Sequence, residues 1–390
     1  MRTLPDSPSL EHLRQQAKDL LQQMRVAQPA ATLSDAQTAV AEQYGYRTWP
    51  DLKAEVDRRN AAVRTLQAPV TAAVASAFDL GKSHGPLIAH ERQWAGQAWV
   101  LRTDRGRWLV RQLFDWFDEA AVEAEVRLAE AAAAAGIRTP RPVRSPTGAI
   151  VERLDDTRWR VFEFLAAGPE PSVPADPRHA AAAGRILAKV HNLGLPAPEP
   201  VQPWLTSVRP ESAWWNLHAA CQSRGMPWAE RLADVIPTIL DACGIVEPTT
   251  AAGDVALSGC HHAPNAFRVA GPRDLVITGF DHAGSIPTRW DLGGTLAGWS
   301  GGVSEQLNVT ALGALRAGYA EERRVPQPLD FGIFSAALCA SMNWLVSRVR
   351  IAINPQEDAE SREIAARAVP TLLVAPPSRE RFQRILDALD

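Results

Sequence analysis

Two short stretches near the middle of the chain decide its fold: ALSGCHHAPN at 256–265 and ITGFDHAG at 277–284. Between them they carry a cysteine, an asparagine, an aspartate and three histidines. Imidazole titrates near neutral pH, and a histidine beside a carboxylate is a common acid/base arrangement. The two stretches therefore predict a functional site.

The same stretches resemble the catalytic centre of the aminoglycoside phosphotransferase family, which reads H-x-D-L-x-P-x-N and then I-D-W-E-x-A-G. Asn265 matches the asparagine, and the terminal A-G falls at 283–284. Cys260 replaces the catalytic aspartate of the family, and Gly279 replaces its metal-holding aspartate. The resemblance implies an α+β, bilobal protein-kinase-like fold in a degenerate member of the family.

The two replacements bear directly on chemistry. In phosphoryl transfer one aspartate accepts the hydroxyl proton, and another holds Mg²⁺ against the phosphates. The thiol of Cys260 is a poor substitute for the oxygen ligands that Mg²⁺ prefers, and Gly279 has no side chain at all. We therefore expect no metal site and no nucleotide cofactor.

The segment 70–167 resembles the small lobe of this fold. Strands are predicted at 87–92, 98–102 and 108–113, with a hairpin turn at 104–106 and a helix at 118–135 stopped by a glycine. In the resemblance, Arg111 is the basic residue of the third strand and Glu125 is its partner on the helix. The arginine of such a pair either binds a phosphate of the ligand or only forms an ion pair that joins the strand to the helix. Together with Asn265 and Gly279, they are the vestigial positions of a nucleotide site.

The segment 176–390 is expected to form a large helical lobe that contains the degenerate catalytic loop. Residues 183–194 resemble the family helix that ends in L-x-x-x-H, with His191 as a core or helix-end histidine. Asp291 matches the family's D-L-A/G motif, where the aspartate anchors the catalytic loop rather than reacting. Helices are predicted at about 210–223, 226–243, 304–324, 331–352, 358–368 and 378–388.

Residues 1–60 are expected to form a separate helical module. Apolar residues recur at helical spacing from residue 10, and Ser34 with Gln37 has the spacing of a capping box. A third helix is predicted from Trp49 to about Arg59. The stretch is similar to a short module found in actinobacterial proteins, and it implies a packing role or a surface for a protein partner.

Four residues of the two motif loops are candidate catalytic groups. Cys260 is a candidate nucleophile, a ligand in a Cys/His metal site, or a small buried residue. In an extended loop it would share a face with His262. His262 and His282 are candidate acids or bases, and Asp281 is the carboxylate that could partner either of them.

Thirteen tryptophans in the chain form an unusual excess. The candidates for ligand binding, together with Arg111, are Trp214, Trp215, Trp290 and Trp299. Because aromatic faces bind flat, apolar or cationic molecules, they favour a largely apolar ligand. The alternative is that these rings fill the core.

Composition excludes several classes of protein. A net charge of −3 argues against a nucleic-acid partner. No run of 18 apolar residues predicts a membrane span, so we expect a cytoplasmic protein without a membrane partner. The four cysteines have neither the spacing of a disulfide framework nor that of a zinc ribbon.

Three functions agree with these observations. The first is a repurposed phosphotransferase fold of bacterial secondary metabolism, which binds an apolar small molecule and catalyses a cyclisation, dehydration or proton-transfer-assisted rearrangement. The second is a non-catalytic pseudokinase that binds or regulates a partner. The third is an atypical phosphotransferase that uses Asp281, Asp254 or another acid of the chain in place of the two missing residues.

Overall fold

The structure is a computed structural model that describes residues 10–28, 31–44, 46, 48–93, 96–113, 119–197, 200–259, 262–301, 306–357 and 359–389. The chain divides into two compact units. The first contains residues 1–115 and 143–164, and the second contains residues 116–142 and 165–390.

The first unit begins with three helices: α1 (Leu10–Ala27), α2 (Leu33–Gln43) and α3 (Trp49–Ala77). A small core joins them, made by Leu13, Ala17, Val40, Ala41, Leu52 and Val56. The capping box of α2 is formed by Thr32 and Asp35, and not by the predicted pair Ser34 and Gln37. Thr32 lies outside the helix in an extended conformation, where its hydroxyl can accept the Asp35 N–H.

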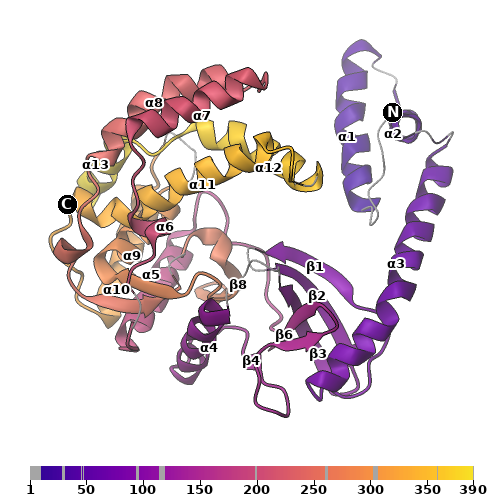
Figure 1. Ribbon diagram of the computed structural model, residues 1–390, viewed down its shortest axis with the longest axis horizontal. Helices are drawn as coiled ribbons and strands as arrows, with labels where there is room; N and C mark the ends of the chain where they lie inside the picture. Colours follow the sequence, from indigo (N-terminus) through magenta and orange to yellow (C-terminus); the bar gives the residue numbers. More distant parts are fainter. Residues whose placement is uncertain are drawn as a thin grey trace. The chain divides into compact units, whose positions relative to one another are not determined.

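Helix α3 is much longer than the sequence predicted, because it continues from residue 59 to Ala77. Leu52, near its start, packs in the core of the module. Val74, in its last turns, and Phe78, directly after it, pack against the sheet. The stretch between them is rich in alanine and contains no glycine, so nothing in it strongly opposes a helix before Pro69. A single helix thus links the module to the sheet (Figure 1).

The sheet of the first unit has six strands in the order β1-β2-β3-β6-β4, with β5 paired to β6. Their bounds are β1 (Ile88–Gln93), β2 (Gly96–Thr103), β3 (Gly106–Leu113), β4 (Pro142–Val143), β5 (Glu152–Leu154) and β6 (Thr157–Glu163). One face packs against the end of α3 through Leu101, Val110, Trp159 and Val161. The three strands and the hairpin predicted for this region are confirmed.

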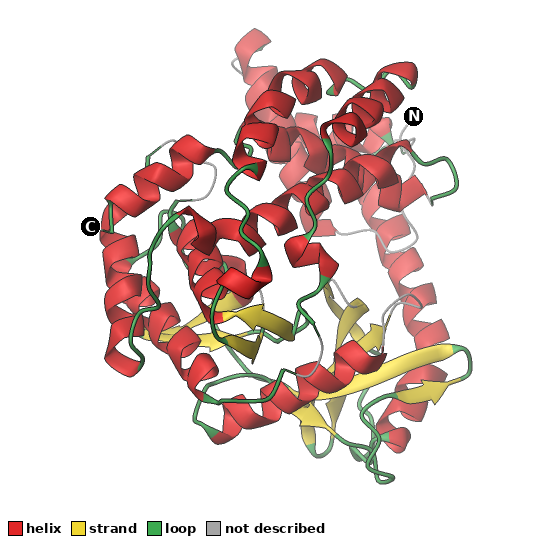
Figure 2. Ribbon diagram, turned by 60° about the vertical axis from the view of Figure 1, so that its left-hand side comes forward, coloured by secondary structure: helices red, strands yellow, loops and turns green. Residues whose placement is uncertain are grey.

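The second unit is mostly helical (Figure 2). Its helices are α4 (Glu119–Ala134), α5 (Pro177–Asn192), α6 (Pro203–Thr206), α7 (Glu211–Ser223), α8 (Ala229–Cys243), α9 (Thr288–Trp299), α10 (Val309–Glu322), α11 (Ser335–Ile353), α12 (Ala359–Val374) and α13 (Arg379–Asp387). Short 3₁₀ turns are η1 (Thr249–Ala251), η2 (Pro264–Ala266) and η3 (Phe331–Phe334). Its strands form two antiparallel pairs: β7 (Val255–Ser258) with β10 (Gly284–Pro287), and β8 (Phe267–Gly271) with β9 (Asp274–Ile277).

Helix α4 belongs to the second unit, although the predicted small lobe of 70–167 included it. Its buried residues Leu128, Ala129 and Ala132 join the main core of the second unit. Helix α4 therefore belongs to the unit against which its apolar face packs, although it follows the strands of the other unit in the chain.

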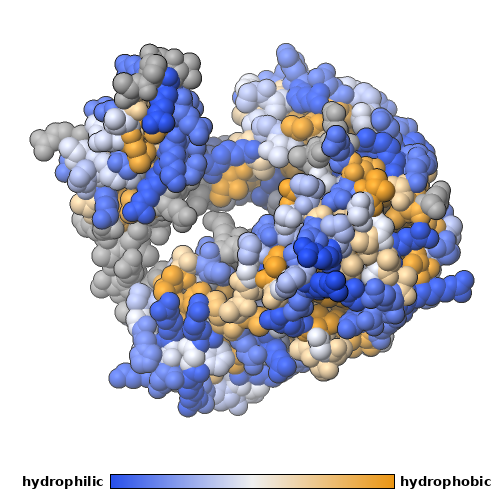
Figure 3. Space-filling model, turned by 180° about the vertical axis from the view of Figure 1, so that it is seen from behind, coloured by the Kyte–Doolittle hydropathy of each residue, from blue (hydrophilic) through white to orange (hydrophobic). Residues whose placement is uncertain are grey.

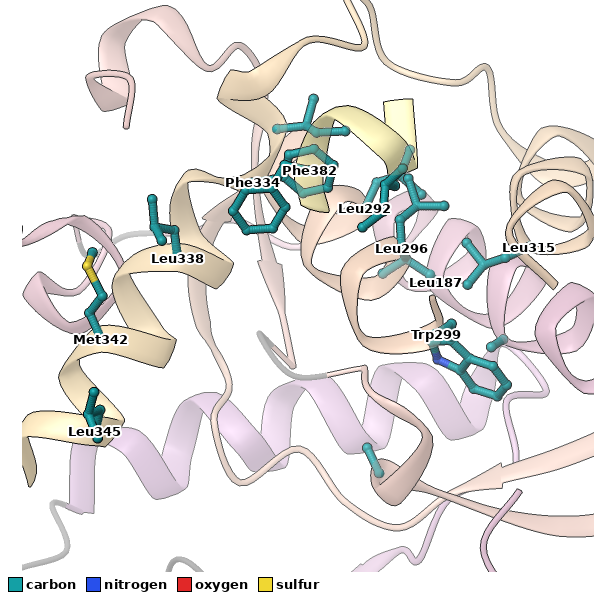
Figure 4. Close-up of a cluster of buried hydrophobic side chains, with 14 of the residues drawn as sticks. Leu187, Leu292, Leu296, Trp299, Leu315, Phe334, Leu338, Met342, Leu345 and Phe382 are labelled. Carbon is teal, nitrogen blue, oxygen red and sulfur yellow. The ribbon is translucent and has the colours of Figure 1, made fainter. Parts of the chain in front are cut away.

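Helices α5 and α10 touch almost backbone to backbone. A Cβ atom added to Gly184 of α5 would collide with the carbonyl oxygen of Leu315, and one added to Gly318 of α10 would collide with that of Ala181. The two glycines allow the close approach that brings the last turn of α5 beside the last turns of α10. Part of the surrounding core, including Leu187 and Leu315, is shown in Figure 4.

Helix α11 has the length and apolar composition that a membrane span requires, and within the described parts of the chain it is the one candidate. It packs into the core of the second unit through Leu338, Met342, Leu345 and Val349. On the face of the molecule drawn in Figure 3, hydrophilic residues predominate and apolar patches are scattered among them. We interpret α11 as a core helix, and the cytoplasmic location stays a prediction.

Deleting residues 1–60 should leave a protein that still unfolds cooperatively. The deletion removes the core of the module but keeps Val74, Ala75 and Phe78, which cover the sheet. Deleting residues 1–78 removes these side chains as well. Burial of each large apolar side chain contributes about 1.5–3 kcal/mol. The longer deletion should therefore lower the free energy of unfolding by several kcal/mol more, as measured by urea denaturation. An insoluble or non-cooperative 61–390 fragment would show that the module is needed by the rest of the chain.

Candidate functional site

The two motif loops meet at one edge of a strand pair in the second unit. The first loop leaves the sheet after Ser258, and the second returns to it at Gly284; these two residues are paired directly across β7 and β10. The other ends of the loops also meet, because the Thr278 N–H donates to the Ala266 carbonyl at 2.9 Å. The tertiary structure thus brings together the segments 256–265 and 277–284.

A buried polar cluster lies beside the first loop and is centred on the carboxylate of Asp291 in α9. The hydroxyl of Ser258 donates a short hydrogen bond to Asp291 Oδ2. His191 Nε2 lies 3.2 Å from the same oxygen, and His191 Nδ1 lies 2.8 Å from the hydroxyl of Tyr319. His262 Nε2 is 3.1 Å from Ser258 Oγ. All five side chains are buried.

The charge states in this cluster follow from its hydrogen bonds. Burial raises the pKa of Asp291. The neighbouring His262 and His191 lower it by a larger amount, so the pKa of Asp291 lies well below its usual range. Burial lowers the pKa of His191 more than Asp291 raises it. A neutral His191 that donates from Nε2 can accept the Tyr319 O–H at Nδ1, so every group in this chain of contacts finds a partner.

The cluster contains a serine, a histidine and an aspartate, but it lacks the geometry of a catalytic triad. In a triad the carboxylate and the serine contact different nitrogens of the histidine. Here Ser258 and Asp291 both face His262 Nε2, at 3.1 and 3.5 Å. The hydroxyl of Ser258 also donates to the carboxylate and has no exposed surface. The arrangement anchors the loop, which is the role predicted for Asp291.

Among the predicted catalytic groups, His262 is part of this anchor. Its side chain is 3% exposed, and its backbone carbonyl accepts the indole N–H of Trp299 at 2.7 Å. A Cβ atom on Gly259 would lie within 2.9 Å of the Phe280 ring and 3.2 Å of the His262 ring. Loop and ring are therefore packed tightly together, and His262 does not face open solvent.

The other predicted catalytic groups lie on the second loop or outside the described residues. Asp281 is half-buried and His282 is exposed, yet packing around the imidazole lowers the pKa of His282 by more than the neighbouring Asp281 carboxylate raises it. Cys260 lies outside the described residues, so its predicted shared face with His262 stays a prediction. His262 and the Asp281–His282 pair are thus placed differently, with one group in the core and the other at the surface.

The tryptophans proposed to bind a ligand mostly belong to the core. Trp214 and Trp290 are fully buried, and Trp299 is 1% exposed. Trp290 donates to Glu247 Oε1 at 2.6 Å, and Figure 4 shows Trp299 among core leucines. Trp215 is 40% exposed and donates to Glu211. In this structure Trp215 is the one of the four whose ring is open to a ligand.

The vestigial nucleotide-site positions are spread over both units. Arg111 on β3 and Glu125 on α4 are each 1% exposed, and they belong to different units, so their pairing stays a prediction. Asn265 is exposed in η2, and its carbonyl accepts from Arg268 at 3.0 Å. Gly279 offers no ligand atom. Within the described residues, no group of three His, Cys, Asp or Glu side chains is placed to hold a metal ion. This donor set does not fit the Mg²⁺ site implied by the resemblance.

Sequence reasoning missed the parts that Ser258 and Tyr319 play in the anchor. The sequence offered a clue to the role of Ser258, because this residue occupies the position of the first histidine in the family motif. Tyr319 had none, because its contact with His191 joins residues 128 positions apart.

Comparison with known proteins identifies the family. Residues 87–329 match the phosphotransferase enzyme family, which is more than half of the chain, so the chain belongs to this family. Residues 3–99 match a family described as glyoxalase superfamily protein. In the described part of that stretch the chain is helical up to residue 77, and strands begin only at Ile88. No curated protein matches the sequence.

Solved structures with the same fold are similar to this chain at low sequence identity. Spectinomycin phosphotransferase APH(9)-Ia, in complex with ADP and spectinomycin, is 13% identical with a TM-score of 0.56, covering 79% of this chain and 95% of its own. Amicoumacin kinase, in complex with AMP-PNP, Ca²⁺ and Ami, is 12% identical with a TM-score of 0.56, covering 84% and 99%. The microcompartment-associated aminopropanol kinase is 14% identical with a TM-score of 0.52, covering 82% and 99%. These likenesses confirm the kinase-like fold.

Replacing Asp291 with asparagine should destabilise the protein while the exposed Asp254→Asn should not. The amide removes the charge and turns one acceptor into a donor that faces other donors. Leaving buried hydrogen-bonding groups unsatisfied costs about 1–3 kcal/mol. The side chain of Asp254 is 88% exposed, and such a surface change is usually within about 0.5 kcal/mol. Equal urea midpoints for the wild type and Asp291→Asn would contradict the anchoring role.

Proposed function

We propose that this protein binds a small molecule and does not carry out the Mg²⁺-dependent phosphoryl transfer of its family. The observation that carries the proposal is the loss of both acids, at Cys260 and Gly279, from a chain that keeps the rest of the fold. One lost acid would have held the metal and the other would have accepted the proton. Without them the bound nucleotide would lack the charge neutralisation that this reaction needs.

Retention of the loop anchor supports a binding role. The first loop begins at a buried hydrogen-bonded group, in which the Asp291 carboxylate contacts Ser258 and His191. These contacts hold the start of the loop in place. An anchored loop without its catalytic acid can still present a fixed surface to a ligand, as preorganised sites do. Exchange of the acids alone would remove phosphoryl transfer and leave this surface intact.

The remaining acids near the loops do not easily restore a kinase site. Asp254 precedes the first residue of β7, whereas the loop follows the last, and a four-residue strand spans about 13 Å. Asp281 is two residues beyond the metal position. An atypical phosphotransferase would therefore have to build its metal site from Asp281 and Asn265, without an aspartate at 279.

The ligand was expected to be largely apolar, as part of bacterial secondary metabolism. Trp215 is the exposed aromatic residue that supports this narrower proposal. The burial of Trp214, Trp290 and Trp299 gives it less support than the sequence suggested.

The affinity for ATP should not increase when Mg²⁺ is added. Gly279 has no side chain to bind the metal, so Mg²⁺ lacks the aspartate that would hold it against the phosphates. Titration calorimetry with ATP, in EDTA and then in excess Mg²⁺, measures this. The double variant Cys260→Asp with Gly279→Asp is the matched comparison. We expect no ATP turnover from it, because residues of a catalytic site act as a non-additive unit.

A micromolar, Mg²⁺-dependent ATP affinity of the wild type would overturn the proposal. Robust turnover by the double variant would instead show that the remaining site is intact and that the two acids alone were lost.

A second candidate function is a non-phosphoryl reaction, such as a cyclisation, dehydration or proton-transfer-assisted rearrangement. The observation that favours it is the Asp281–His282 pair, in which an accessible imidazole lies beside a carboxylate in the sequence and burial keeps the pKa of His282 below its usual value. The neutral form of such a histidine can accept a proton as a general base.

If this second function holds, Asp281→Asn and His282→Gln should each lower turnover by about 10²–10⁴-fold, the usual contribution of a positioned acid or base. Turnover is measured on the compound that the wild type consumes from a bacterial metabolite extract. Asp274→Asn is the control, because its carboxylate forms a surface ion pair with Arg138 at 2.6 Å. Full activity in both loop variants would rule out this pair as the catalytic groups.

A further inference from the structure

Three sulfur-bearing side chains come together where the end of α8 lies against α11. The thiol of Cys243, the last residue of α8, donates to the thioether of Met342, with 3.4 Å between the two sulfur atoms. Four residues further along the chain, the Glu247 N–H donates to the hydroxyl of Ser335 at 3.0 Å. The stretch 243–247 therefore runs along one side of α11, between Met342 and Ser335.

Cys339 lies on the same side of α11. Ser335, Cys339 and Met342 have the spacing i, i+4 and i+7, and residues at this spacing share one face of a helix. Because Ser335 and Met342 both contact the stretch 243–247, Cys339 between them faces it as well. Burial and, to a smaller extent, the neighbouring Cys243 raise the pKa of the Cys339 thiol to about 12. Two thiols and one thioether thus lie close together.

This three-sulfur cluster is enclosed, and its partly exposed end is at Cys243. Cys339 is fully buried and Met342 is 2% exposed, whereas Cys243 is half-buried. Figure 4 shows Met342 on α11, between Leu338 and Leu345. An ion that enters past Cys243 would be shielded from water by the surrounding core.

Oxygen donors next to the cluster are engaged elsewhere. The Glu247 carboxylate accepts from Arg289 at 2.8 Å and from the indole of Trp290 at 2.6 Å. The Ser335 hydroxyl donates to the Gly332 carbonyl at 2.7 Å and accepts the Glu247 N–H. Among the described side chains at this contact, the donors left for an ion are the two thiols and the thioether.

We propose that Cys243, Cys339 and Met342 form a three-sulfur site for one soft monovalent metal ion, Cu(I). Thiolate and thioether ligands select soft ions of this kind. Zn²⁺ takes thiolate, imidazole and carboxylate ligands and is almost always four-coordinate in structural sites, so three sulfurs that include a thioether suit it poorly. An iron–sulfur cluster is held by four cysteines. On binding, Cu(I) replaces the two thiol protons, which pass to solvent.

A metal ligand is a better role for these cysteines than a reactive thiol. The thiolate is the nucleophile and the form that oxidises readily, and burial raises the pKa of both Cys243 and Cys339. Coordination differs, because a bound metal ion deprotonates the thiol that holds it. None of the three residues belongs to the Asp291 anchor or to the motif loops, so the inference does not rest on the proposed function.

The test offers Cu(I) to the reduced full-length protein without oxygen, in competition with a coloured Cu(I) chelator. We expect the chain to take up one Cu(I), measured as loss of the chelator colour. Ultraviolet absorption from thiolate-to-copper charge transfer should appear in parallel. The melting temperature should rise, because the ion binds the folded chain. Zn²⁺ at the same free concentration should raise it by less.

Met342→Leu is the sharpest variant, because this swap nearly conserves volume and is well tolerated in cores. It should weaken Cu(I) binding by at least about tenfold, since even an outer-shell partner of a metal ligand contributes about 10–100-fold. Cys339→Ala should remove the charge-transfer absorption. Cys221→Ala is the matched control, because Cys221 is also fully buried but lies on α7 beside Trp228, at the opposite end of α8 from Cys243. It should bind Cu(I) as the wild type does.

If Cys339→Ala does not fold, Cys243→Ser at the partly exposed position should also remove the absorption. The proposal is overturned if the wild type takes no Cu(I) from the chelator, or if Zn²⁺ binds as tightly. It is also overturned if either Met342→Leu or the cysteine variant that folds binds Cu(I) as the wild type does. Cys260→Ala should bind normally, and loss of binding in that variant would place the ion at the first motif loop and likewise overturn the proposal.

Discussion

The carboxylate of Asp291 ties together parts of the second unit that are far apart in the chain. It accepts hydrogen bonds from Ser258 at the end of β7 and from His191 at the end of α5, and through His191 it reaches Tyr319 of α10. A buried charge is tolerated only when it is well hydrogen-bonded. The positions of α5, α9, α10 and the first loop are therefore interdependent.

The contacts that hold this part of the fold are made by buried side chains, and none of them involves Gly279. Cys260 and Gly279 stand where the family resemblance expects its two acids, and both positions fall within the two motif stretches. The interior of a family scaffold and its reaction can thus change separately, which is why fold alone predicts function poorly.

In the first unit, the strand register shows how the basic residues of the sheet are arranged. The family resemblance draws attention to Arg111 alone, as the basic residue of a nucleotide site. The strand register adds Arg160 directly opposite it and Arg158 nearby on the same face.

The sequence by itself determined the fold family and most of the helices and strands, because motif spacing and hydrophobic periodicity are local properties of the chain. It also gave Asp291 its anchoring role. Only the tertiary structure decided which residues complete the anchor, that α3 runs unbroken to the sheet, and that Trp214, Trp290 and Trp299 fill the core. Burial and contacts between distant residues depend on how elements pack, and no local pattern specifies them.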